Sequence, residues 1–263
     1  MDIASILGLV IGIAVILGSQ MLESGGNISI IHPTAALIVF GGTIGAIFLS
    51  FSLTTIISSI KSLKKVFMPE QIDIKILITD MVNLTELTRR EGNLSLEPII
   101  KDIDNDFLRK GIQLVADSAN PRVIKEIMNT QIDYEEESHL INARVLEAAG
   151  GFAPTFGIVG AVLGLIQVMQ HIAEPAQLGQ GIATAFIATV YGVGIANIVL
   201  LPLGSKIRLR AREEILVKEM IVEGVLSIHA GENPSVLEEK LNSFLTDHQR
   251  FAFSEELVEN EGW

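Results

Sequence analysis

Hydroxyl side chains are the main polar groups inside the long apolar runs of this sequence. Those that could lie near the middle of the membrane are Thr43, Thr155, Thr184, Thr189 and Tyr191. A hydroxyl oxygen can ligate a cation or pass on a proton, but no Asp, Glu, Lys or Arg occurs in these runs, where one charge would cost about 2.5–3.5 kcal/mol. An ion pathway normally needs an ionisable group inside the membrane, so ion conduction would require a carboxylate from another protein. For each threonine alone, hydrogen bonding to its own helix is the simpler alternative.

Other kinds of chemistry have little support in the residue types. The chain has no cysteine, which excludes disulfides, Cys-based metal sites and thiol nucleophiles. It contains no Gly-x-Ser-x-Gly motif and no phosphate-binding glycine loop ending in Lys, and its 5 histidines are scattered. A net charge of −12 disfavours nucleic acid as the partner. We therefore expect a protein that is not an enzyme. His32 and His171, which border apolar runs, are either pH-sensitive groups or bystanders.

The run from Gly150 to His171 is the stretch that the other elements must position. At about 1.5 Å per residue, some twenty helical residues cross the roughly 30 Å hydrocarbon core of a bilayer. Helical spacing places small residues on one face, namely Gly150, Ala153, Gly157, Gly160, Ala161 and Gly164. Such a face lets another helix approach closely, either a partner helix or a neighbour in a static bundle. Pro154 lies on the same face and predicts a bend or hinge, because it lacks an amide hydrogen.

Four apolar runs predict an all-α, polytopic membrane protein with four transmembrane helices and a cytoplasmic helical domain. The runs are Ile3 to Leu22, Pro33 to Ser52, Gly150 to His171 and Gly181 to Leu203. The predicted segments are a transmembrane hairpin (1–53), a cytoplasmic helical lobe (54–147), spans three and four (148–203), and cytoplasmic C-terminal helices with a tail (204–263). The Asn120-Pro121 pair predicts a helix start in the lobe.

The positive residues predict the orientation of the chain. All 19 Lys and Arg residues lie between Lys61 and Arg144 or between Lys206 and Arg250. Because positive residues flanking membrane helices stay in the cytoplasm, both termini and both polar segments are expected there. In the lobe, the phrase RREGNLSLEP is most simply a solvated turn between helices, and the acidic residues 135–137 are most simply a water-facing stretch.

Three phrases of the sequence resemble the flagellar motor stator A subunits, the MotA or PomA family. GGFAPTFGIVGAVLGLIQVM and FIATVYGVGIANIVLLPL resemble the third and fourth spans of that family. RREGNLSLE resembles its loop between spans two and three. The three phrases in this order, within a four-span layout, make the resemblance specific, and it covers most of the chain.

The resemblance implies a stator subunit that converts ion-motive force into torque in the bacterial cytoplasmic (inner) membrane. Homo-oligomeric A subunits, expected as a pentamer, would surround two B-type (MotB-like) subunits that supply the transmembrane aspartate. The implied ion-pathway and coupling residues are Pro154, Thr155, Ala161, Thr189 and Pro202. The implied contacts with a rotor switch protein (FliG-like) are Arg89 and Glu97. Membrane lipid is a further expected partner, and no cofactor is expected besides the transported ion.

The coupling ion is expected to be a proton. Sodium-driven members of the family carry a threonine seven residues after the proline of the third span, and this chain has Ala161 there. Two alternatives stay open at this stage. A TolQ or ExbB type energiser would have three spans and an external N-terminus, so topology separates it from a stator. A passive membrane scaffold would conduct no ions, so a measurement of ion flux with a B partner distinguishes a scaffold from a stator.

Overall fold

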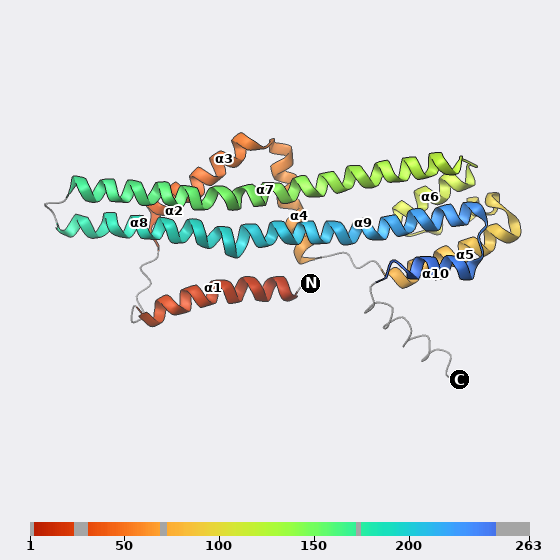
Figure 1. Cartoon of the computed structure of the whole chain (residues 1–263), viewed down its shortest axis with the longest axis horizontal. Coiled ribbons are helices and arrows are strands. Elements are labelled where there is room, and N and C mark those ends of the chain that lie inside the picture. Colours follow the sequence, from red (N-terminus) through yellow and green to blue (C-terminus); the bar gives the residue numbers. More distant parts are fainter. Residues whose placement is uncertain (1–2, 24–30, 69–72, 172–174, 246–263) are drawn as a thin grey trace. The chain divides into compact units, whose positions relative to one another are not determined.

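The structure, a computed structural model, describes residues 3–23, 31–68, 73–171 and 175–245, and all regular secondary structure in these ranges is helical (Figure 1). This confirms the predicted all-α class. The helices are α1 (Ile3–Glu23), α2 (Pro33–Ala36), η1 (Leu37–Gly41), α3 (Gly42–Ser50), α4 (Leu53–Phe67), α5 (Ile74–Glu91), η2 (Asn93–Asp102), α6 (Asp106–Ala116), α7 (Pro121–Gln170), α8 (Pro175–Ile195), η3 (Ala196–Leu200), α9 (Leu201–Ala230) and α10 (Pro234–Asn242).

Four helical segments are long and apolar enough to cross a membrane, as the hydropathy of the sequence predicts. The first is α1, and the second is the continuous segment Pro33–Ser50. The third lies within α7, and the fourth begins in α8. Mean hydropathy over the best window of each ranges from 1.7 to 2.2. The number of spans therefore agrees with the four-span prediction and not with a three-span layout.

Side-chain caps begin the helices of the polar part of the chain. The amide of Arg122 donates to Asn120 Oδ1 at 2.9 Å, and α7 starts at Pro121, as the Asn-Pro pair predicts. Asp73 caps α5 and Asn105 caps α6 in the same way, each accepting from two amides of the first turn. These caps satisfy amide groups that a helix start leaves without a partner.

Proline acts differently in the two long membrane helices. α7 stays helical through Pro154 and continues to Gln170, so this proline does not end the helix. Pro202 follows η3, a π-helical turn in which the backbone is wider than in an α-helix. A proline cannot donate to the carbonyl four residues earlier and crowds it, and a π turn of this kind relieves the crowding. The sequence pattern did not indicate this π turn.

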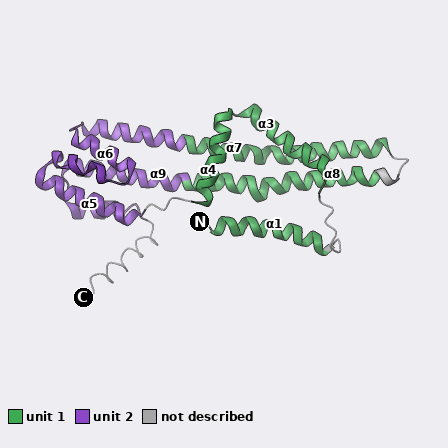
Figure 2. Ribbon diagram, turned by 180° about the vertical axis from the view of Figure 1, so that it is seen from behind, with its two compact units in different colours: residues 1–70, 138–210 green, residues 71–137, 211–263 purple. Residues whose placement is uncertain are grey.

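The chain forms two compact units (Figure 2). One contains residues 1–70 and 138–210, which include the membrane-crossing segments, and the other contains residues 71–137 and 211–263. The helices α7 and α9 contribute residues to both. These units reflect packing, whereas the segment boundaries at 53, 147 and 203 predicted from hydropathy concern the membrane surface and stay predictions. The predicted C-terminal tail, the last dozen residues, lies outside the described residues.

The second unit has a close-packed apolar core. Its fully buried side chains include Met81 of α5, Ile112 of α6, Met128 of α7 and Ile221 of α9. Helices approach closely where glycine faces a large side chain: a Cβ on Gly111 would lie 2.7 Å from the side chain of Val225, and one on Gly224 would lie 2.3 Å from Met81. This core holds the polar turn between α5 and η2 in place.

Candidate functional site

The small-residue faces of α7 and α8 pack against each other within one chain. A Cβ on Gly192 of α8 would lie 2.5 Å from the carbonyl oxygen of Ala153 and 3.1 Å from Cα of Gly157. Toward the other end of α8, a Cβ on Gly164 would lie 2.7 Å from the carbonyl oxygen of Gly181. Figures 1 and 2 both show the two helices side by side. Of the two readings of these stripes, packing within the bundle is therefore the one that the structure supports.

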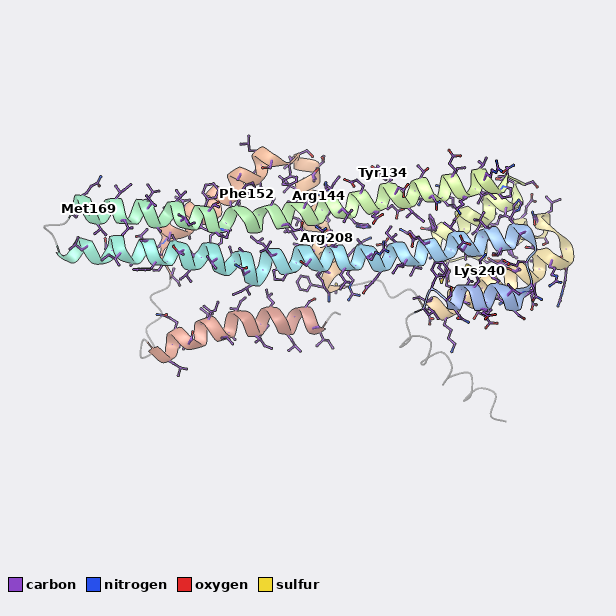
Figure 3. The ribbon with its side chains drawn as sticks, in the orientation of Figure 1. Tyr134, Arg144, Phe152, Met169, Arg208 and Lys240 are labelled. Atoms are coloured by element: carbon purple, nitrogen blue, oxygen red, sulfur yellow. The ribbon has the colours of Figure 1, made fainter. Side chains whose placement is uncertain are left out.

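The faces of α7 and α8 away from this contact carry large apolar side chains that are exposed in the single chain. On α7 they include Ile158 at 61% exposure and Met169 at 67%, the latter labelled near the end of the helix in Figure 3. On α8, Phe186 is 70% exposed. A surface of this composition suits lipid or apolar partner helices. A partner helix seated on the glycine stripe was the other alternative, and the close contact of α7 with α8 does not favour it.

The predicted pathway residues lie along this helix pair. Thr189 lies at the close contact between the two helices. A Cβ on Gly157, which is one helical turn beyond Pro154, would lie 3.4 Å from Cα of Thr189. Pro154, Ala161 and Thr189 are half-buried, whereas Thr155 is exposed. The structure thus brings Thr189 to the α7 turn that follows Pro154.

Pro202 lies close to the same part of α7. A Cβ on Gly150, four residues before Pro154, would lie 2.7 Å from the side chain of Leu201, which precedes Pro202. Pro202 itself is exposed. The helix segments that carry the two prolines therefore pack against each other, so a change of shape at one would reach the other.

The hydroxyls of the four threonines named above each bond to a carbonyl of their own helix, which confirms the simpler of the two alternatives for these residues. The bonds from Thr43, Thr155, Thr184 and Thr189 reach Val39, Phe152, Gln180 and Ala185, at 2.6, 2.6, 2.8 and 3.1 Å. The phenol oxygen of Tyr191 accepts from the amide of His32 at 3.2 Å. Since the threonines donate their protons locally, they offer an ion only their remaining lone pairs.

Arg89 and Glu97 stand on a rigid, exposed turn. Arg89 is in the last turn of α5, Gly92 ends that helix with φ 83° and ψ 171°, and Glu97 follows in η2. This backbone conformation is essentially restricted to glycine, and it confirms the predicted turn at Gly92-Asn93. Fully buried Leu96 anchors the turn next to Glu97.

The charges on this turn differ in their partners. Arg90 pairs with Glu86 at 3.8 Å. Arg89 and Glu97 are both exposed, and among the described residues neither takes part in an ion pair or a side-chain hydrogen bond. The structure therefore distinguishes Arg89 from its neighbour, and the sequence signal that could have indicated this is Glu86, which lies at helical spacing before the two arginines.

One acidic residue that the sequence assigned to a water-facing stretch is partly buried instead. Glu135 accepts from Lys218 and from Gln131, and Lys218 also pairs with Glu214 at 3.0 Å. The Lys218 side chain is only 13% exposed, with its ammonium 5.9 Å from the centre of the Phe107 ring. The interpretation of residues 135–137 as water-facing was thus wrong for Glu135.

Burial and pairing act in opposite directions on this ion network. Burial alone would raise the pKa of Glu135, but hydrogen bonds from Lys218 and Gln131 outweigh it, so the pKa lies below its usual value. Burial would lower the pKa of Lys218, but hydrogen bonds to Glu135 and Glu214 raise it above its usual value. Both groups are therefore held in their charged forms near neutral pH. The network joins α7 to α9 in the second unit.

Known proteins are similar in sequence to this chain over nearly its whole length. Motility protein A of Bacillus subtilis (strain 168) is 33% identical over 258 residues, covering 97% of this chain and 95% of that protein. The chain belongs to the motility protein A family. Residues 6–92 match the family described as Motility protein A N-terminal, and residues 99–220 match the MotA/TolQ/ExbB proton channel family. Chemotaxis protein PomA of Vibrio alginolyticus is 32% identical over 251 residues, 95% of this chain and 98% of that protein.

Two solved structures share the motility protein A fold. The structure of C. jejuni MotAB matches with a TM-score of 0.88 at 31% identity, covering 94% of this chain and 97% of that one. The flagellar MotAB stator complex from Bacillus subtilis matches with a TM-score of 0.86 at 32% identity, covering 95% and 99%. The resemblance stated from the sequence is confirmed, as is the expectation that the chain is not an enzyme, and the energiser alternative is not favoured. These matches support a flagellar stator subunit of the inner membrane.

Proposed function

We propose that this chain forms, with a B-type (MotB-like) partner, a proton channel that converts ion-motive force into torque on the flagellar rotor. The observation that carries the proposal is that the membrane-crossing parts of α7 and α8 contain no charged residue. Their glycine faces are used within the chain, their outer faces are large and apolar, and their runs contain no carboxylate. A channel built on this pair needs an aspartate from a partner helix, which is what a B-type subunit would provide.

The proposed ion path runs between that aspartate and the face of spans three and four that carries Pro154, Ala161 and Thr189. Protonation of the aspartate removes its charge, which changes the cost of placing it against an apolar surface. The partner helix then sits differently against the ring of A subunits, and the ring moves relative to the partner. Thr155 lies on the exposed side of the Pro154 turn, and Pro202 flanks the same region through the contact of Leu201 with Gly150.

Torque would pass to a rotor switch protein (FliG-like) through Arg89 and Glu97. Support comes from their exposure and from the rigid turn that holds them. Opposite charges on one turn can meet a partner that carries the complementary pair, and such contacts steer association and set register. We further propose a pentamer of this chain around two B subunits, with both termini in the cytoplasm and with anionic lipid at the positively charged inner ends of the spans.

The first test is the swimming speed of a stator-deleted cell that expresses this chain with its own B partner. Sodium is replaced by potassium while the proton-motive force is held constant. We expect motility to continue, because Ala161 offers no oxygen ligand to sodium. Motility that disappears only without sodium would keep the stator role and contradict the choice of a proton.

A matched pair of variants sharpens this test. Ala161→Thr adds a hydroxyl at the half-buried position on the proposed path, and Val162→Thr adds one at its 51% exposed neighbour. We expect Ala161→Thr to lower the speed more than Val162→Thr. Absence of motility in both media, with the complex shown to be assembled, would contradict the stator role itself.

A further inference from the structure

A groove lies between α1 and the end of the fourth span, next to Pro202. Its volume is about 460 Å³, within the range of roughly 300–1,000 Å³ that is typical of ligand sites. One wall is the small-residue face of α1 around Gly8, and the other is formed by Ile198, Pro202 and Leu203. All the lining residues belong to the first unit.

The groove is closed at one end. A Cβ on Gly12 would lie 2.9 Å from the side chain of Ile198, so α1 and η3 touch there. From Ile198 the other wall continues through Pro202 to Lys206, eight residues or about 12 Å of helix away. Half of a hydrocarbon core is roughly 15 Å thick, so the length of the groove suits one leaflet.

The other end of the groove is polar and positive. Lys206 lines it together with Ser5 and with Phe67, the last residue of α4. Phe67 packs on the cluster of Val66, Ala143 and Ile207, which places it near Lys206 rather than near the closed end. The preceding turn of α4 carries Lys64 and Lys65. An apolar slot with a positive mouth is complementary to an acyl chain with an anionic head group.

We propose that this groove binds an anionic phospholipid, with its acyl chain along Gly8 and Pro202 and its phosphate at Lys206. The site places lipid directly against the proline that we assign to coupling. The inference uses the membrane placement proposed above, but it depends on neither ion flow nor rotation. A second copy of the chain seated in the groove is the competing occupant.

The test uses the purified full chain with its B partner, with tryptophan moved into the groove. The natural chain has 1 tryptophan, at position 263, so the double variant Phe67→Trp with Trp263→Phe has its only tryptophan at the mouth. Any tryptophan of the B partner is replaced by phenylalanine in the same complex. The complex is placed in phosphatidylcholine vesicles with increasing mole fractions of brominated phosphatidylglycerol in one series and of brominated phosphatidylcholine in the other. We expect the brominated phosphatidylglycerol to quench at about fivefold lower mole fraction, since one lysine near the surface gives roughly this preference.

Two further variants identify the site. Adding Lys206→Gln should remove the preference and leave the quenching by the two lipids equal. Gly8→Leu should weaken quenching by both, because a Cβ at Gly8 has nothing within 4 Å and its side chain would enter the groove. Gly18→Leu on the same helix, also with nothing within 4 Å but outside the lining, should change neither.

Three results would overturn the lipid site. The first is equal quenching by the two lipids without the Lys206 substitution, and the second is a preference for phosphatidylglycerol that survives Lys206→Gln. The third is an assembled complex in which neither lipid quenches, which would show that protein covers the groove. None of these measurements involves motility. Failure of the lipid site therefore leaves the stator function standing, and failure of the stator function leaves the lipid site standing.

Discussion

Alanine at Gly192 tests whether the contact between α7 and α8 is as close as the structure shows. The added Cβ would lie 2.5 Å from the carbonyl oxygen of Ala153, whereas ordinary contact begins at 3.4 Å. The obstacle is backbone, which cannot rotate away, so the two helices must separate by about 0.9 Å or the chain must distort. Overpacking of this kind costs roughly 1–3 kcal/mol.

Gly194→Ala is the matched control for this variant. It lies two residues away on the same helix and would meet nothing within 4 Å. Both substitutions gain the same helix propensity, about 1 kcal/mol relative to glycine, so their difference isolates the clash. The assay is thermal unfolding of the purified complex in detergent. We expect the Tm of Gly192→Ala to be lower than that of Gly194→Ala by roughly 2–12 °C, at about 2–4 °C per kcal/mol for a chain of this size.

Equal melting temperatures of the two variants would refute the close contact. A comparable loss in Gly194→Ala would also refute it, because the effect would then follow from glycine itself and not from the neighbour. Swimming speed gives a second measurement. If α7 and α8 must separate to admit the Cβ, Gly192→Ala should lower the speed more than Gly194→Ala, since Thr189 faces α7 one turn away.

Three further predictions concern the second unit. Arg89→Glu should lower torque, measured as the rotation rate of tethered cells under load, while assembly with the B partner is unchanged, and Arg90→Glu should lower it less because Arg90 already pairs with Glu86. Gly92→Ala should reduce the free energy of unfolding by about 1–3 kcal/mol, since φ 83° with ψ 171° is strained for any residue with a Cβ. Lys218→Met should reduce it by roughly 1–3 kcal/mol at pH 7, because Glu135 loses its cation. Because the pKa of Glu135 is lowered on folding, its contribution is present above about pH 4.5 and declines as the pH falls further, and the variant should lack this decline.

Each of these predictions has a control and an outcome that contradicts it. Equal torque for the arginine variants at positions 89 and 90 would remove the distinction between them. Gly151→Ala, where a Cβ has nothing within 4 Å, should be tolerated, and a loss equal to that of Gly92→Ala would argue against strain. Lys101→Met, at an exposed lysine, should leave stability unchanged, and an effect as large as that of Lys218→Met would show that the buried ion network is not its cause.

The sequence by itself determined the elements and the faces that they present. Hydropathy and length predicted four membrane-crossing helices, and the Asn120-Pro121 pair marked the start of α7, because these signals depend only on neighbouring residues. The stripe of Gly150 to Gly164 predicted a close approach for the same reason. The motif phrases were sufficient to indicate the family, and the comparisons bear this out.

Only the tertiary structure decided what meets each face. Regularly spaced small residues indicate that another segment packs closely, but the segment that meets Gly157 is the backbone of Ala188, Thr189 and Gly192, far away in the sequence of the same chain. The pair of Arg90 with Glu86 is different, because the two residues lie four positions apart on one helix and helical spacing is a local signal for it. Glu135 looked water-facing because Lys218, the cation that allows its burial, lies in a different helix. Local sequence patterns indicate which face of a helix a residue lies on. Contacts between helices that are distant in the sequence depend on tertiary packing, which a local pattern does not indicate.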